Sequence, residues 1–351
     1  MSRWLLVAVL VLPMAAWPDA RPSDTKNLAF LVTGAGAVVC LVRAAWLRAL
    51  CAWTAVSALC AASAPWALWG LAGVLAWALL HQQAAALSPT SWRKVRAAIA
   101  AAALVQIAWL GVQALGLDPL FVPTVTQGGI RPAHVPLTGW FGNPMDLALF
   151  LGLSLPALVA VSPWLLLPAA AALLALQATA GFVCAGTLAL WLALIRLPRW
   201  CAWMAVVGIL GLVVAAVLVR DPQGLGRRPT GWAIAARLAW ERPLVGWGPN
   251  AVDHRIQIVD ATTNNRWNFF FNEWLQGAVE LGVIGPALAA GYLVSLARRL
   301  RGRWLACGEA LPAALALLAV SLFSIPLRIG PTALLAALYL GRLESIAQEA
   351  A

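Results

Sequence analysis

The chain has 351 residues, of which 62% are apolar and 11% are charged, and its formal net charge is +11. Such a composition excludes a soluble globular protein, because folding it in water would expose large apolar patches. The sequence predicts an all-α fold, a polytopic membrane bundle of about twelve transmembrane helices. The positive charge does not indicate nucleic-acid binding, since much of it lies beside apolar runs and nothing resembles a nucleic-acid motif.

Apolar runs of about 15 to 23 residues predict the membrane spans. The shorter runs, 4–17 and 330–341, are expected to extend into flanking residues or to lie where the bilayer thins. Residues 1–219 contain the first nine spans, residues 220–271 form one long outer loop, and residues 272–351 contain the last three spans and a tail. In chain order the expected spans are 4–17, 28–42, 49–63, 66–80, 97–116, 144–161, 164–179, 182–195, 201–219, 273–296, 305–325 and 330–341.

The basic residues predict the orientation of these spans, because Lys and Arg next to a span are retained on the cytoplasmic side. Even numbers of spans separate the basic clusters, which therefore fall on one face: Arg43 and Arg48, residues 93–96, Arg196 and Arg199, and residues 298–303. With that face inside, both termini are cytoplasmic. The segments 18–27, 117–143 and 220–271 then lie on the outer face.

The long outer loop carries seven arginines and no lysine. The planar guanidinium suits two-pronged contact with phosphate. Alternatively these arginines pair locally or meet lipid headgroups, as Arg237 could with Glu241 at helical spacing. Thr230 is expected to cap a short amphipathic helix that runs to about Glu241, before the glycines at 246 and 248 turn the chain. The apolar face of this helix is expected to contain Trp232, Ala235, Leu238 and Ala239.

Three polar residues near the ends of spans have structural interpretations. Asn143, followed by Pro144, has the pattern of a helix N-cap, and Asn272 is expected to start the tenth span in the same way. Glu280 lies one to two turns inside that span, where an unpaired carboxylate is costly. Glu280 is therefore expected to have a partner or a function.

Several of these residues belong to runs that resemble a known family. Arg228-x-x-x-Trp232, the run Glu-Arg-Pro-Leu-Val-Gly-Trp-Gly-Pro at 241–249, Asn-Glu-Trp-Leu-Gln at 272–276 and Glu-Leu-Gly-Val-Ile-Gly at 280–285 resemble the signature of the O-antigen ligase and O-antigen polymerase superfamily. Residues 139–148 resemble the other hallmark of that superfamily. The resemblance reaches from Gly139 to Gly285.

The resemblance implies a glycosyltransferase in a bacterial inner membrane that needs neither a metal nor another cofactor. Such an enzyme moves a glycan from undecaprenyl pyrophosphate to lipid A core oligosaccharide, to a growing glycan or to a protein, among membrane lipids and without nucleic acid. Fixed arginines can stabilise the charge on a pyrophosphate leaving group. Ligase and polymerase are both compatible with the motifs. A carrier is a weaker alternative, because the spans are almost free of charge and the two halves show no repeat.

The resemblance also assigns roles to single residues. Arg228, with Arg227 beside it, corresponds to the loop arginine expected to contact the donor pyrophosphate. Arg131 is the candidate for the arginine before the first motif, although it lies farther from Phe141 than in the usual pattern. The remaining motif residues are Asn143, Trp232, Gly246, Gly248, Asn272, Gln276 and Glu280.

The sequence departs from the family at Phe271, where a histidine is expected as the base that activates the acceptor hydroxyl. The candidate replacements are Glu273, His254 and His134, in that order. Glu273 comes first because it lies two residues past the vacant position and near the membrane surface, where partial desolvation strengthens a carboxylate as a base. The alternatives are a solvated first-turn glutamate and an inactive relative of the family.

Overall fold

The computed structural model describes residues 45–61, 64–117, 137–196, 198, 222–254, 258–260, 265–267 and 269–349. The expected spans 4–17, 28–42 and 201–219 lie outside these residues, as do Arg131 and His134.

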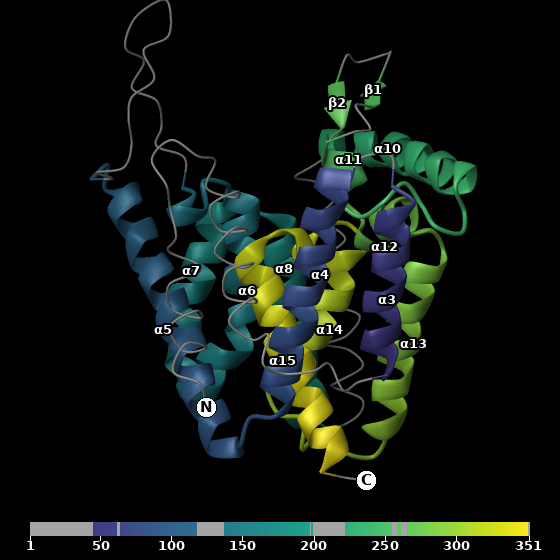
Figure 1. Ribbon diagram of the computed structural model, residues 1–351. Helices are drawn as coiled ribbons and strands as arrows, with labels where there is room; N and C mark the ends of the chain where they lie inside the picture. The colour runs from purple at the N-terminus through teal and green to yellow at the C-terminus, as the bar shows by residue number, and fades with distance from the viewer. Residues whose placement is uncertain are drawn as a thin grey trace, which may run out of the picture.

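Most of the described helices run along one common direction and form a bundle (Figure 1). In chain order they are α3 (Ala45–Leu59), α4 (Ala64–Ala85), α5 (Pro89–Ala114), α6 (Pro144–Val161), α7 (Leu166–Leu176), α8 (Thr179–Arg196), α12 (Glu273–Leu281), α13 (Ile284–Arg299), α14 (Ala310–Ser321) and α15 (Gly330–Gln348). Three short 3-10 turns accompany them, η2 (Gly139–Phe141), η3 (Pro163–Leu165) and η4 (Pro326–Arg328).

The long loop forms a separate layer across one end of the bundle (Figure 1). It contains α10 (Pro222–Glu241), α11 (Ala251–His254) and an antiparallel ribbon of β1 (Ile258–Asp260) and β2 (Asn265–Trp267), in which Ile258 lies opposite Trp267. Apart from this ribbon, the regular structure of the described residues is helical, as the composition predicts.

Within the described part of the chain, three helices are long and apolar enough to cross a membrane: α5, α6 and α8. They belong to one large apolar core with α4, α14 and α15, in which α6 lies against both α5 and α8, and α15 lies along α4. Close approach of α15 to α4 depends on Gly341, because a Cβ there would lie 2.5 Å from the carbonyl oxygen of His81.

The basic clusters that the structure describes lie at one end of the bundle, as predicted. At the start of α5, Arg96 pairs with Glu309 before α14 at 3.3 Å, and Arg299 at the end of α13 pairs with Glu344 near the end of α15 at 2.6 Å. We call this end, which contains Arg96, Arg299 and Glu344, the basic end. The opposite end, covered by α10, is the loop end (Figure 1).

The expectation of one continuous span over residues 273–296 is wrong, because the chain forms two helices, α12 and α13, that meet at Gly282. Gly282 has φ +66°, and a Cβ there would overlap the carbonyl group of Leu244. The last carbonyls of α12 have no partner within the helix. Instead, those of Val279 and Glu280 accept hydrogen bonds from the backbone N–H groups of Trp247 (2.9 Å) and Gly248 (3.0 Å). The helix ends where the loop docks onto it.

The expected start of the loop helix at Thr230 is also wrong, since α10 begins at Pro222 and ends, as predicted, at Glu241. Proline is favourable at the first position of a helix, which suits a start at residue 222. The predicted apolar face is confirmed: Ala235 is buried and Leu238 packs beside it against a small core of Val252, Phe270 and Val279.

Candidate functional site

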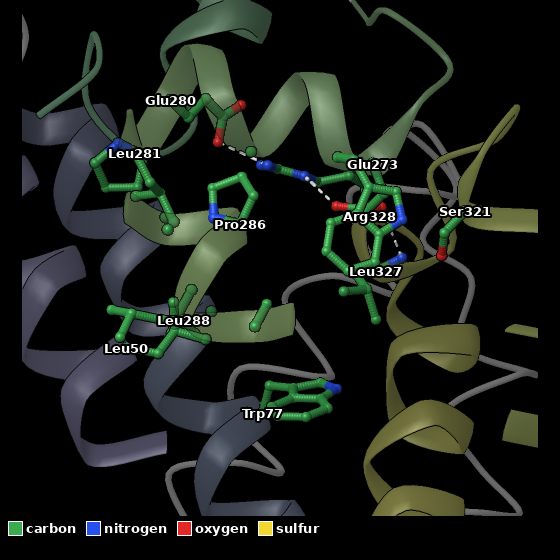
Figure 2. Close-up of a pocket in the computed structure, with 18 of the residues that line it drawn as sticks. Leu50, Trp77, Glu273, Glu280, Leu281, Pro286, Leu288, Ser321, Leu327 and Arg328 are labelled. Atoms are coloured by element: carbon green, nitrogen blue, oxygen red, sulfur yellow. Dashed lines mark hydrogen bonds and ion pairs between the residues drawn. The ribbon is translucent and has the colours of Figure 1, made fainter. Parts of the chain in front are cut away.

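A cavity of about 370 Å³ lies among α3, α4, α12, α13 and the turn η4. Most of its lining is apolar and includes four tryptophans, Trp46, Trp69, Trp77 and Trp274. Toward the loop end the lining becomes charged, with Glu273, Glu280 and Arg328 (Figure 2). The cavity therefore combines a long apolar wall with one charged end.

Arg328, the last residue of η4, lies between two carboxylates of α12 (Figure 2). Its Nη2 donates a hydrogen bond to Glu280 Oε2 at 2.6 Å, and its Nε lies 3.4 Å from Glu273 Oε1. Residues about two turns apart share one face of a helix, which explains how one guanidinium reaches both carboxylates. We call Glu273, Gln276, Glu280 and Arg328 the charged cluster.

Glu280 has the partner that its position in a span predicts. Its side chain is only 1% exposed, and Arg328 balances its charge. Oε2 also accepts from the backbone N–H of Asn250 at 2.9 Å, while Oε1 accepts from Gln276 Nε2 at 2.9 Å. Both oxygens are thus hydrogen-bonded, as a buried carboxylate requires.

Gln276 connects this carboxylate to the loop. Its Oε1 accepts from the backbone N–H of Phe270 at 3.1 Å, and the carbonyl of Phe270 accepts from Trp232 Nε1 at 3.0 Å. The motif residues Trp232, Gln276 and Glu280 therefore belong to one chain of hydrogen bonds that joins α10 to α12.

Glu273 is the first residue of α12 and lines the cavity. Besides its contact with Arg328, Oε2 accepts from the backbone N–H of Leu327 at 3.2 Å. Its side chain is only 14% exposed. The alternative of a solvated first-turn glutamate is therefore wrong.

Both predicted N-caps are confirmed. Asn143 Oδ1 accepts from the backbone N–H of Met145 at 2.9 Å, with Pro144 as the first residue of α6. Asn272 Oδ1 accepts from the backbone N–H groups of Trp274 (3.1 Å) and Leu275 (3.0 Å), and its Nδ2 donates to the carbonyl of Leu322 at 2.9 Å. Asn272 thereby caps α12 and ties it to the end of α14.

Arg228 lies beside Phe271. Its Nη1 donates to the carbonyl of Phe323 at 3.0 Å, and its guanidinium carbon is 5.9 Å from the ring centres of both Phe271 and Phe323. Phe271 itself has φ +50°, a conformation that is uncommon for a residue other than glycine. The loop arginine and residue 271 are therefore neighbours in space.

The predicted turn at the glycines is confirmed, with φ +70° at Gly246 and +103° at Gly248. A Cβ at Gly246 would overlap the carbonyl group of Glu280, and one at Gly248 would overlap Ala61. Both positions therefore require glycine, Gly246 because the loop passes over the end of α12 and Gly248 because the loop lies against Ala61, just after the end of α3.

The remaining candidate site residues are Arg227, His254, Arg131 and His134. Arg227 lies in α10 and His254 ends α11, but their side chains are outside the described part of the chain, as are Arg131 and His134 altogether.

Sequence reasoning missed Arg328. Its signal is a lone arginine between the expected spans 305–325 and 330–341, on the side expected to face outward, where the orientation rule disfavours arginine.

A scan against models of known protein families finds no match to this chain, and a search of characterised proteins also finds none. The class is therefore defined by fold and site alone: a helical protein with apolar helices suited to a membrane and a buried carboxylate–arginine cluster at one end of an apolar cavity.

Proposed function

We propose that the protein is a lipid-linked glycan transferase of the O-antigen ligase and polymerase type. In this proposal it is a bundle of about twelve spans in a bacterial inner membrane, with both termini cytoplasmic and the loop end periplasmic. It moves a glycan from undecaprenyl pyrophosphate to an acceptor such as lipid A core oligosaccharide. The observation that carries the proposal is the convergence of Trp232, Gln276 and Glu280, from separate motifs, in one hydrogen-bonded network beside the cavity.

The shape and lining of the cavity support a lipid donor. Its apolar wall suits a prenyl chain, since burying apolar surface contributes about 25 cal/mol per Å². Its charged end lies toward the loop, where the donor's glycan would meet the acceptor. Two carboxylates against one guanidinium give the charged cluster a net negative charge. We therefore expect the pyrophosphate on the side of Arg228 rather than against the cluster.

In the proposed reaction, Glu273 accepts the proton of the acceptor hydroxyl. The hydroxyl oxygen attacks the anomeric carbon of the donor sugar, and the bond from that carbon to the pyrophosphate oxygen breaks. The electron pair leaves with undecaprenyl pyrophosphate, whose charge Arg228 stabilises. Glu273 suits the role of base because it lines the cavity and one of its oxygens has only a 3.4 Å contact with Arg328.

A deletion strain tests this function through its lipopolysaccharide, separated on a gel, with the gene returned on a plasmid as the control. Loss of all long glycan chains identifies a ligase acting on lipid A core. A single capped repeat identifies a polymerase. An unchanged lipopolysaccharide and unchanged surface polysaccharide would contradict the proposal, and purified protein that transfers no glycan in liposomes containing lipid-linked donor and acceptor would contradict it directly.

A further inference from the structure

Arg328 contacts its two carboxylates unequally. Its contact with Glu280 is short, at 2.6 Å, and Glu280 is itself held by Asn250 and Gln276. Its contact with Glu273 is longer, at 3.4 Å between Nε and Oε1, and among the described residues that Nε has no hydrogen-bond partner. Arg328 is thus fixed on the side of Glu280 and presents its other side to Glu273.

The turn that carries Arg328 is fixed as well. Thr332 Oγ1 donates to the carbonyl of Ile329 at 2.9 Å and also to that of Pro326, so it ties η4 to the first turn of α15. The backbone N–H of Leu327 in the same turn donates to Glu273. One short segment therefore holds the Glu273 carboxylate through both a backbone group and a charged side chain.

We propose that Arg328 is a positioning residue that keeps Glu273 ionised and directed into the cavity, ready to accept the proton of the acceptor. The catalytic part of this inference rests on the proposed function. The electrostatic part, that Arg328 keeps Glu273 ionised, does not depend on it.

The charges around Glu273 make the expected effect specific. Among the described residues, the charged groups that act on it are Arg328 from η4 and Glu280 from α12 itself. Arg228 of α10 faces Phe271 and Phe323, and Arg242 after α10 lies over Trp247. Two further elements packed against α12 contribute only distant arginines, Arg48 on the exposed surface of α3 and Arg298 and Arg299 at the far end of α13. Without Arg328, burial and the nearby Glu280 both favour the protonated form of Glu273, which therefore takes up its proton at a higher pH.

Labelling with dicyclohexylcarbodiimide, which reacts with protonated carboxylic acids in apolar surroundings, measures this effect without any activity assay. In membranes, Arg328→Gln should increase labelling of Glu273 at neutral pH about tenfold and raise the pH of half-maximal labelling by about one unit, as mass spectrometry of the peptide would show. Arg299→Gln is the matched control, because it should increase labelling of Glu344 and leave Glu273 unchanged. Equal labelling of Glu273 in wild type and Arg328→Gln overturns the inference.

The pH dependence of glycan transfer tests the catalytic part. In Arg328→Gln, the acid limb of the profile of kcat against pH should move to a pH about one unit higher, with little change in KM for the lipid donor. In Arg328→Lys, the acid limb should largely return to its wild-type pH. If Arg328 has only a structural role, Arg328→Gln should lower the rate at every pH and leave the acid limb at its wild-type pH. That result would overturn the positioning role. Should Arg328→Gln fail to accumulate, the double variant Glu280→Gln/Arg328→Gln removes both members of the short pair and keeps Glu273 for the same measurements.

The two assays separate the two possible failures. Transfer by wild type with an unshifted limb in Arg328→Gln overturns the positioning role and leaves the proposed function standing. If labelling of Glu273 shifts in Arg328→Gln but neither wild type nor any variant transfers glycan, the proposed function and the catalytic role are overturned. The electrostatic effect of Arg328 on Glu273 would still stand.

Discussion

Each end of the bundle holds a buried carboxylate next to arginine, and the two sites differ in geometry. At the basic end, both nitrogens of the Arg299 fork bond to Glu344, at 2.6 and 2.7 Å, and Gln348 adds a third hydrogen bond at 3.2 Å. At the loop end, one guanidinium is shared by two carboxylates, and its contact with Glu273 is 3.4 Å. The first site satisfies its own charges completely. In the second, Arg328 Nε has no hydrogen-bond partner among the described residues, and Arg328 and Glu273 both line the cavity.

The two sites also join different kinds of element. The basic-end pairs join regular helices, Arg299 on α13 to Glu344 on α15, and Arg96 on α5 to Glu309 beside α14. The charged cluster instead joins a broken helix, a loop and a turn. A buried ion pair is by itself weak evidence for a function. Incomplete pairing at the edge of a cavity is the feature that distinguishes the loop end.

The largest difference that the proposed orientation predicts between the two ends is in accessibility from the periplasmic side of the membrane. A cysteine placed at Thr230, which is exposed on α10, should react with a membrane-impermeant maleimide, and one placed at the exposed Arg301 should not. Mass spectrometry of the labelled peptides separates these positions from the native cysteines. The reverse pattern would contradict the proposed orientation, in which the loop end faces the periplasm.

The next largest effect is on catalysis. Glu273→Gln keeps the shape of the side chain and removes the proposed base, so the proposed glycan transfer should fall by about 100-fold or more. Glu344→Gln, the matched change at the basic end, should lower thermal stability and leave the rate per folded molecule unchanged. If Glu273→Gln transfers at the wild-type rate, the base is elsewhere, and His254→Ala and His134→Ala test the other two candidates. If transfer also persists in both of these, Phe271→His becomes the informative variant, because a gain of activity would mark a relative that lost its catalytic histidine.

Stability should respond differently to the same backbone substitution at the two ends. Gly282→Ala places a Cβ where it overlaps the carbonyl group of Leu244, at a residue whose φ is positive. The substitution should reduce the free energy of unfolding by about 3 kcal/mol. Gly302→Ala, at φ +81° with open space around it, should cost about 1 kcal/mol. Denaturant unfolding in detergent micelles compares them. Equal losses would show that docking of the loop onto α12 adds little stability.

A smaller effect is expected from arginines that donate to backbone carbonyls. Arg228→Lys keeps the charge but loses the planar guanidinium that is proposed to contact the pyrophosphate and that lies near Phe271 and Phe323, so the proposed transfer should fall about tenfold. Arg303→Lys at the basic end, where Nη1 lies 3.5 Å from the carbonyl of Ile346, should leave the rate unchanged. Near-normal transfer by Arg228→Lys at equal protein level would reduce Arg228 to a packing role.

The smallest effect concerns two further ion pairs among the described residues. Arg237 and Glu241 on α10 are 84% and 43% exposed, so Arg237→Ala should change the free energy of unfolding by no more than about 0.5 kcal/mol. The side chain of Arg342 is only 13% exposed. Arg342→Ala should therefore reduce the free energy of unfolding by about 1 kcal/mol, because the substitution removes a packed apolar stem. A larger loss at Arg237 would give α10 a more central role than its exposure suggests.

The sequence determined the features that depend on neighbouring residues and on the solvent. A continuous apolar run is unfavourable in water and favours a buried or membrane-embedded helix. The helices of the described bundle therefore lie near the positions that these runs predict. The caps at Asn143 and Asn272 and the turns at Gly246 and Gly248 follow from local backbone chemistry. The sequence also indicated that Glu280 needs a partner, since the cost of a buried charge holds whatever the fold.

Only the tertiary structure decided which residue that partner is and where α12 ends. Arg328 lies 48 residues from Glu280 in sequence, and no local rule selects it. The apolar pattern continues through Gly282, so the break appears only when the loop supplies donors for the carbonyls of Val279 and Glu280. These contacts gain their energy from groups that meet after the chain has folded. The geometry of the charged cluster therefore belongs to the assembled bundle rather than to any segment of it.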